Sequence, residues 1–273
     1  MNPWDQLLFL FSGEGSLRLW FTLFIAAGLL AGVATGYLKA RKIQPRGFKW
    51  RTFRNEALFA VINVAVSGTL IAAAMSWLLN HGWIAVDKSP ADWWEIGLQY
   101  VLYFFLFDTW FDWLHRWMHN EPVYTWVHKL HHFSTSPNLL TTFSVNPLES
   151  LINGGFVPIF LTAMAFVWPV HEQAMALITP TNVIMGLYVH SGYELMPRWW
   201  NRSWLTKWFI TATFHDQHHK YFRVNFGGYT TIWDRICGTM RPRYEEELMA
   251  IKDRAAAGIA TSAAAPQEPA GAA

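Results

Sequence analysis

The chain of 273 residues has a single cysteine, Cys237, and few charged residues. One cysteine excludes an internal disulfide and a metal site built from several thiolates. Charged residues make up 15% of the chain, against roughly 25% for an ordinary soluble domain. The net charge of +2 is too small to indicate a nucleic-acid partner. No basic segment precedes Asp5, so no cleavable signal peptide is expected.

Apolar and aromatic residues are abundant by contrast. They account for 52% and 17% of the chain, and there are 17 tryptophans. Tryptophan favours membrane–water interfaces, where its ring is half buried and its N–H stays hydrated. The composition therefore indicates a membrane protein.

Two uncharged apolar stretches flank a basic segment near the N-terminus. They cover residues 19–37 and about 57–79, and each is long enough to cross roughly 30 Å of hydrocarbon as a helix. Residues 39–54, between the two stretches, include seven basic residues with no acid among them: Lys39, Arg41, Lys42, Arg46, Lys49, Arg51 and Arg54. Positively charged loops remain on the cytoplasmic side, so we assign this segment to the cytoplasm rather than to nucleic-acid binding.

Three further apolar stretches predict helices from residue 93 to beyond residue 107, over 151–170 and over 174–188. The last two predict a hairpin that crosses and returns. We expect an all-α, polytopic membrane bundle of about four to five spans, with a helical cap at the cytoplasmic face. The chain then divides into N-terminal spans (1–92), a catalytic domain (93–245) and a disordered Ala-rich tail (246–273).

A tryptophan-rich segment at residues 198–210 lies between the last predicted span and the C-terminal part of the catalytic domain. Trp200, Trp204 and Trp208 recur every four residues, with basic residues between them. This spacing predicts a helix that lies in the membrane interface.

Eight of the eleven histidines occur in three short motifs. The first is H-x-x-x-H, and the second and third are both H-x-x-H-H. Residues three and four apart share a helix face, so each motif is expected to direct its imidazoles at one point. The histidines are His115 and His119, then His128, His131 and His132, and finally His215, His218 and His219. Imidazole is a common ligand for iron, zinc, copper and nickel.

Other polar residues accompany these motifs. Asp108 and Asp112 share a helical stripe with His115 and His119. We interpret them as acceptors that orient the N–H groups of ligand rings, with pairing to a nearby Arg or Lys as the alternative. His190 ends the last predicted span on the side of the three motifs.

The number of histidines favours two metal ions. One tetrahedral zinc needs about four ligands, whereas eight or nine imidazoles suit two ions of higher coordination. Soluble di-iron bundles use Glu-x-x-His, which does not occur here. The sequence therefore indicates an all-imidazole centre with two metals, where iron could activate dioxygen beside a lipid chain.

This arrangement resembles the fatty acid hydroxylase/sterol desaturase superfamily of integral-membrane oxygenases. The resemblance covers roughly residues 97–240, including the segments 190–194, 225–227 and 233–235. It implies two non-haem iron ions at the cytoplasmic face, with dioxygen as co-substrate and a lipid as substrate. The eight motif histidines take the family's ligand positions, and His190 takes a further one. Asn146 departs from the pattern, because many relatives carry a histidine there.

Electrons must come from outside the chain. The sequence has no G-x-G-x-x-G fingerprint for a flavin or nicotinamide, and it has no cytochrome b5-like domain. We therefore expect a separate ferredoxin, cytochrome or NAD(P)H reductase as partner. The Ala-rich tail and the absence of a retrieval signal favour a bacterial plasma membrane over the endoplasmic reticulum.

Two other classes of protein compete with the lipid oxygenase. A non-catalytic metal-binding protein or transporter would place its ligands near the bilayer midplane, whereas these motifs fall at span ends. A haem-binding cytochrome needs two to four histidines and explains neither H-x-x-H-H motif. The sequence leaves open hydroxylation against desaturation, and a sterol, hopanoid, fatty acyl, carotenoid or aminolipid substrate.

Overall fold

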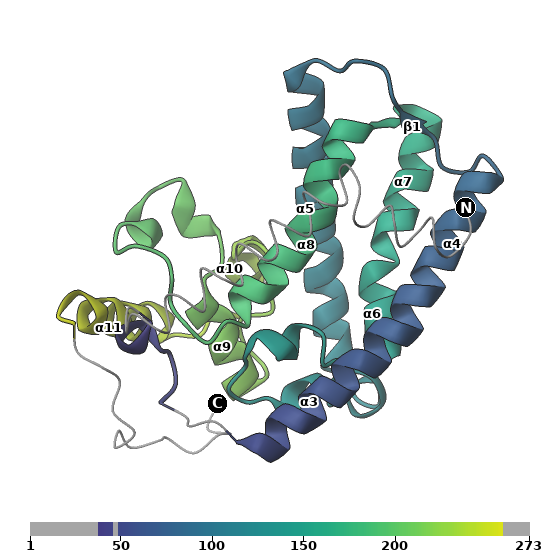
Figure 1. Cartoon of the computed structure of the whole chain (residues 1–273). Helices are drawn as coiled ribbons and strands as arrows, with labels where there is room; N and C mark the ends of the chain where they lie inside the picture. The colour runs from purple at the N-terminus through teal and green to yellow at the C-terminus, as the bar shows by residue number, and fades with distance from the viewer. Residues whose placement is uncertain (1–37, 46–48, 259–273) are drawn as a thin grey trace.

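A computed structural model describes residues 38–45 and 49–258 of the chain. It is mostly helical, as predicted (Figure 1). The helices are α3 (Trp50–Asn63), α4 (Thr69–Asn80), α5 (Trp93–Met118), α6 (Pro147–Gly154), α7 (Phe156–Val167), α8 (Glu172–Val189), α9 (Ala212–Tyr221), α10 (Ile232–Cys237) and α11 (Tyr244–Ala256). Shorter helical turns are η1 (Lys39–Arg41), η2 (Val64–Gly68), η3 (Tyr124–His128), η4 (His131–Phe133), η5 (Leu139–Thr142), η6 (Trp200–Arg202) and η7 (Thr206–Trp208). The strands β1 (Val86–Asp87) and β2 (Val170–His171) pair in parallel.

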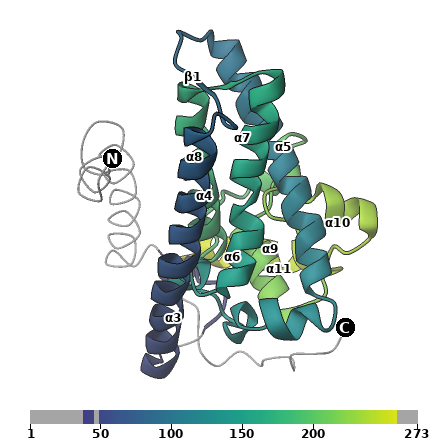
Figure 2. The ribbon, with the colours of Figure 1, turned by 90° about the vertical axis from the view of Figure 1, so that its right-hand side faces the viewer.

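Long helices form a bundle on one side of the molecule (Figures 1 and 2). α3, η2 and α4 continue into one another from Trp50 to Asn80, and α5 packs along α8. Among the described residues, Trp50–Asn80 and Pro147–Val167 are long and apolar enough to cross a membrane. α5 and α8 are helical where the sequence predicts spans. Their polar residues make them less apolar than the two segments above. The predicted span over residues 19–37 lies outside the described residues.

The bundle has an aromatic interior and an apolar exterior. Tyr103 and Phe107 on α5 pack against Phe156 and Phe160 at the start of α7. Outward-facing side chains are also apolar, including Val61 (67% exposed) on α3 and Phe166 (71% exposed) on α7. Such a face has no favourable partner in water but suits hydrocarbon.

Some buried polar side chains inside the bundle have hydrogen-bond partners that join its elements. Asn63 donates to the carbonyl of Phe143 at 3.0 Å. Gln99 donates to the carbonyl of Pro169 and accepts from the backbone N–H of His171, which ties α5 to β2. These bonds offset the cost of burying the amides.

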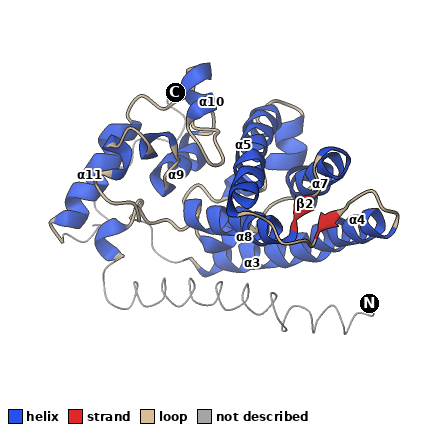
Figure 3. Ribbon diagram, turned by 90° about the horizontal axis from the view of Figure 1, so that it is seen from above, coloured by secondary structure: helices blue, strands red, loops and turns tan. Residues whose placement is uncertain are grey.

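A second layer, which contains α9, α10 and α11, packs beside the bundle (Figure 3). Leu248 on α11 is fully buried in the cluster that includes Phe214 on α9 and Val189 at the end of α8. The prediction of a disordered tail from residue 246 is therefore wrong for residues 246–256. Apolar burial orders this helix despite its Ala-rich end; residues 259–273 lie outside the described part.

The predicted interfacial helix at residues 198–210 is also wrong. Only the short turns η6 and η7 form there. Ser203 accepts from the backbone N–H of Leu205, and Thr206 donates to the carbonyl of Trp200 at 2.5 Å. Such side-chain bonds to the backbone compete with a regular helix. Trp204 remains 78% exposed in this segment.

Candidate metal centre

Four elements bring all nine predicted histidines together. The end of α5 supplies His115 and His119, and the segment from η3 to η4 supplies His128, His131 and His132. His190 follows the last residue of α8, and α9 supplies His215, His218 and His219. The capping box formed by Asp92 and Glu95 fixes the start of α5. Thr211 caps α9 by accepting from the N–H of Phe214.

The nine rings form two groups, in each of which the ligand atoms lie within 4.8 Å of one another. The five-histidine group consists of His115, His119, His128, His132 and His218; the four-histidine group consists of His131, His190, His215 and His219. Neighbouring Nε2 atoms are 3.0 to 3.2 Å apart in the first group. They are 3.0 to 3.3 Å apart in the second.

Adjacent histidines divide between the groups. His131 and His132 are consecutive in the sequence but belong to different groups. The same is true of His218 and His219. Successive residues of a helical turn point about 100° apart, whereas residues i and i+4 share a face. The prediction that each motif aims at a single point is therefore wrong for both H-x-x-H-H motifs. Each of them serves two neighbouring points, and ring centroids of the two groups, His132 and His219, are 4.8 Å apart.

The outer ring nitrogens determine the tautomer of three histidines. Nδ1 of His115 lies 2.7 Å from the carbonyl oxygen of Phe226, and that of His218 lies 2.8 Å from the carbonyl of Val224. Nδ1 of His190 is 2.8 Å from the carbonyl of Gly186. A carbonyl only accepts, so each Nδ1 carries the proton. The inward Nε2 of each ring therefore presents a lone pair.

Burial keeps the rings neutral. The pKa values of His131, His132, His215, His218 and His219 are well below the ordinary value, first because burial disfavours the imidazolium and then because the rings crowd one another. Neutral imidazole is the form that binds a metal.

The donor set fits a pair of metal ions. Two nitrogens that are each about 2.1 Å from one ion lie roughly 3.0 to 3.4 Å apart for octahedral to tetrahedral angles. The observed separations agree with this range in both groups. Converging lone pairs cannot hydrogen-bond to one another, whereas a cation satisfies all of them.

The hydrogen bonds of Asp108 and Asp112 go to residues other than the histidines. Asp108 accepts from the backbone N–H groups of Tyr229 and Thr230 at 2.8 and 3.0 Å, and from the Thr230 hydroxyl. Asp112 forms a 2.5 Å ion pair with Arg116. The prediction that both orient ligand N–H groups is wrong. For Asp112 the structure instead shows the alternative, which is an ion pair with a nearby basic residue.

Asp112 is instead the outer end of a chain of ion pairs and hydrogen bonds that reaches His115. Arg116 also pairs with Asp234 at 3.1 Å. The carboxylate of Asp234 accepts from the N–H groups of Phe226 and Gly227 at 3.0 and 2.7 Å. This holds the loop whose Phe226 carbonyl faces His115.

The comparisons with known proteins show the family to which this chain belongs. Residues 100–239 match the fatty acid hydroxylase family model. This chain belongs to the fatty acid hydroxylase family. The resemblance to the fatty acid hydroxylase/sterol desaturase superfamily that the histidine motifs predict is thereby confirmed.

Several sterol-modifying enzymes are similar to this fatty acid hydroxylase family member. Methylsterol monooxygenase 1 of Danio rerio is 36% identical over 136 residues, which are 48% of this chain and 43% of the relative. Delta(7)-sterol 5(6)-desaturase ERG3A of Gibberella zeae is 26% identical over 254 residues, 88% of this chain and 67% of the relative. Lathosterol oxidase of Mus musculus is 28% identical over 158 residues, 57% of this chain and 49% of the relative.

This family member spans about half the length of most of the curated relatives it matches. No solved structure matches it.

One acidic residue beside the centre escaped the sequence analysis. Glu149 on α6 is buried, and its Oε2 lies 3.0 Å from Nδ1 of His128. Asn146, the departure from the family pattern, caps α6 by accepting from the N–H of Leu148 and donates to the carbonyl of Trp126. Asn146 therefore joins α6 to η3 and sets Glu149 beside His128. The only sequence signal is the acid three residues after Asn146.

Proposed function

We propose that this protein is a membrane-bound, non-haem di-iron oxygenase that hydroxylates or desaturates a lipid. The five-histidine group would hold one iron and the four-histidine group the other. The observation that supports this most strongly is the convergence of nine Nε2 atoms into two adjacent groups.

Iron is favoured over zinc by the chemistry of the relatives. Imidazole suits both metals, but zinc has no redox chemistry. The relatives are named as monooxygenases, desaturases and oxidases, and these activities need a redox-active ion. When bound, the irons supply the activation of dioxygen.

The chain itself orients the rings and provides a lipid-sized cavity. A cavity of about 470 Å³ has almost entirely apolar walls, which include Ser191, the residue that follows His190 in the sequence. Its lining residues are Phe104, Ile184, Met185, Leu187, Tyr188, Ser191, Leu195, Met196, Trp200, Phe209 and Ile210. Such a site excludes water and takes an alkyl or sterol skeleton rather than a sugar or nucleotide.

Both reactions balance with dioxygen, two electrons and two protons. Hydroxylation breaks a C–H bond, forms a C–O–H group and reduces the second oxygen atom to water. Desaturation removes two hydrogens from adjacent carbons and reduces both oxygen atoms to water. The electrons would come from a separate ferredoxin, cytochrome or NAD(P)H reductase.

The membrane placement is part of the same proposal. α5 and α8 would cross beside Trp50–Asn80 and Pro147–Val167, which with residues 19–37 gives about five spans. The basic segment then places the histidine centre on the cytoplasmic side of a bacterial plasma membrane. Part of that segment lies against the second layer, since Arg254 donates to the carbonyl of Lys42 at 2.5 Å. We retain a division into spans to residue 92 and a catalytic domain from residue 93.

Metal analysis and lipid profiling test this function together. The purified chain should contain about two irons per molecule and show no haem absorption. A strain that lacks the protein should lose one oxygenated or unsaturated lipid. Restoration of that lipid by the wild type but not by His218→Ala would support the oxygenase. Bound metal with an unchanged lipid profile would instead indicate a non-catalytic metal-binding protein or transporter.

A further inference from the structure

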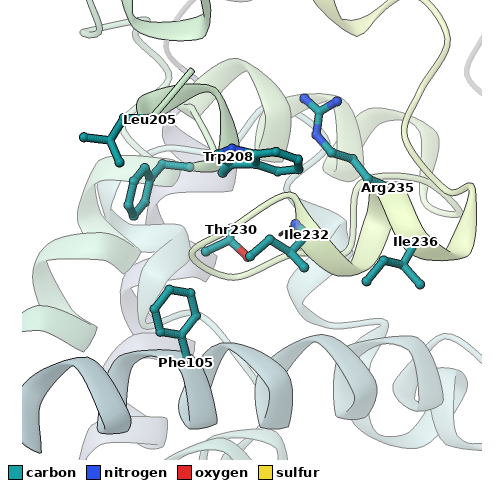
Figure 4. A pocket seen from close by; sticks show the side chains of 8 residues that line it. Phe105, Leu205, Trp208, Thr230, Ile232, Arg235 and Ile236 are labelled. Carbon is teal, nitrogen blue, oxygen red and sulfur yellow. Dashed lines mark hydrogen bonds between the residues drawn. The ribbon is translucent and has the colours of Figure 1, made fainter. Parts of the chain in front are cut away.

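A second apolar groove lies outside the histidine centre. It has a volume of about 650 Å³ and is formed by α5, the segment around η7, and α10 (Figure 4). Its lining residues are Phe105, Leu205, Trp208, Phe209, Thr230, Ile232, Arg235 and Ile236. Figure 4 shows Leu205 and Trp208 on one side and Phe105 on the other.

The groove opens on a surface that is itself apolar. Phe105 is 46% exposed and Ile236 is 69% exposed. Phe105 belongs to the outward face of α5, which also exposes Leu102 and Leu106. In the proposed membrane placement this face contacts acyl chains, so a lipid chain can enter the groove without crossing water.

Two cations lie against Trp208, a residue that lines the groove. The guanidinium carbon of Arg235 is 5.4 Å from the centroid of the Trp208 ring, and Nζ of Lys207 is 5.1 Å from it. Such cation–π contacts keep both charges close to the ring. Nε of Arg235 donates to Thr231, which leaves the terminal nitrogens available to an anion.

Among the described residues, no acidic side chain forms an ion pair with either cation. No Asp or Glu lines the groove, and none of the ion pairs within residues 38–45 and 49–258 involves Arg235 or Lys207. The neighbouring Asp234 is buried and occupied by Arg116. The site therefore combines a long apolar slot with a cationic rim.

We propose that this groove binds one anionic phospholipid, with an acyl chain against Phe105 and Ile232 and the phosphate on Arg235 and Lys207. A lipid without phosphate would leave both cations without a partner, a zwitterionic phosphatidylcholine would bring its own choline cation close to them, and a free phosphate would leave the apolar slot unfilled. The proposal rests on the membrane placement given above but is independent of the oxygenase activity.

Lipid retention by the full-length chain tests the proposal. The protein is reconstituted in vesicles of equal parts phosphatidylglycerol and phosphatidylcholine, extracted in mild detergent, and its retained lipids are measured by mass spectrometry. The wild type should retain phosphatidylglycerol preferentially. Arg235→Gln and Lys207→Gln should each reduce that preference about fivefold. One cation near an anionic lipid contributes about 1 kcal/mol to binding, and this free energy corresponds to that factor.

Two further variants separate the headgroup from the chain. Arg202→Gln is the matched control, because Arg202 is an exposed basic residue of the same segment that does not line the groove. It should keep the wild-type preference. Ile232→Trp fills the slot and should reduce the retention of both lipids. Metal content, measured on every variant, should equal that of the wild type and shows that the fold persists.

Equal retention of the two lipids by the wild type would overturn the proposal. So would a preference that Arg235→Gln leaves unchanged, or a lipid-free dimer in the native mass spectrum. Failure of the membrane placement would be visible separately, as release of the chain from membranes by alkaline carbonate. None of these outcomes depends on turnover.

Discussion

The two histidine groups differ in how firmly the protein holds their rings. In the five-histidine group, His115 and His218 have backbone carbonyls at Nδ1, and His128 has the carboxylate of Glu149 within 3.0 Å. In the four-histidine group, His190 has such a carbonyl. His215 and His219 have no hydrogen-bond partner at Nδ1 among the described residues, and the same holds for His132 in the five-histidine group.

Because of this difference, we expect the two groups to have different affinities for their metal ions. Partners at the outer nitrogen fix the tautomer and the ring orientation, and their loss typically weakens metal affinity. The four-histidine group has fewer nitrogens and fewer fixed rings, so we expect its metal to be the more labile one.

Removal of one ring from either group should have the largest effect. His218→Ala and His131→Ala should each abolish turnover and lose about one metal per chain while the protein still inserts, because each ring belongs to one group. Metal analysis and product detection measure the two results. His81→Ala is the control, since His81 is exposed and bonds to the carbonyl of Trp77. Full turnover by either variant would refute the assignment.

Chelator treatment of the same two variants compares the groups directly. His131→Ala keeps the five-histidine group intact, and His218→Ala keeps the four-histidine group. We expect the metal of His218→Ala to be released about tenfold faster, as followed by metal content against time in chelator. Equal release rates would contradict the expectation that the four-histidine group holds its metal less firmly.

Glu149 should contribute to the five-histidine group alone. Glu149→Gln should lower the metal affinity of that group about 10–100-fold, because the amide is a weaker acceptor for the ring of His128. Metal titration in the His131→Ala background measures this. Glu172→Gln, at the end of α8 distant from His190, is the matched control and should have no effect. The same loss in the control would show a general effect of removing an acid.

Asp112 should have a smaller effect than Glu149 because it acts only through Arg116. Asp112→Asn leaves the pair between Arg116 and Asp234 in place. We expect a decrease in turnover of less than about tenfold with unchanged metal content. Loss of metal in this variant would show that the chain of ion pairs and hydrogen bonds to His115 is stronger than the contacts indicate.

Substitution of Asn146 should affect the stability of the fold more than it affects the binding of either metal. Asn146→Ala removes the cap of α6 and the bond to Trp126. It should lower the free energy of unfolding by about 1 kcal/mol, with metal content close to that of the wild type. A denaturant or thermal melt in detergent measures the change. Asn146→Ser, which retains a cap, should recover part of the stability.

Much of the candidate site could be predicted because histidine spacing is a local property. The i, i+4 pairs such as His115 and His119 follow from helix geometry alone. The division of His131 from His132 also follows from that geometry, although we expected a single point for each motif. The partners of Asp108 could not be found this way, because Tyr229 and Thr230 lie 121 and 122 residues away in the sequence.

The fold was predictable where a segment is long and uniformly apolar. Trp50–Asn80 is helical as expected. The Ala-rich end of the chain predicts disorder, but α11 precedes most of it and is helical because Tyr244, Leu248 and Ile251 recur at helical spacing and are all buried. The irregular segment around Trp200 and Trp204 depends on hydroxyl-to-backbone bonds that a periodic pattern of tryptophans does not reveal.

Iron content per chain tests the account most directly. The purified full-length protein should contain about two irons, and this ratio should fall to about one in His215→Ala, which removes a ring of the four-histidine group, and in His132→Ala, which removes one of the five-histidine group. A wild-type ratio of one that only one of these variants changes would contradict a centre with two metals.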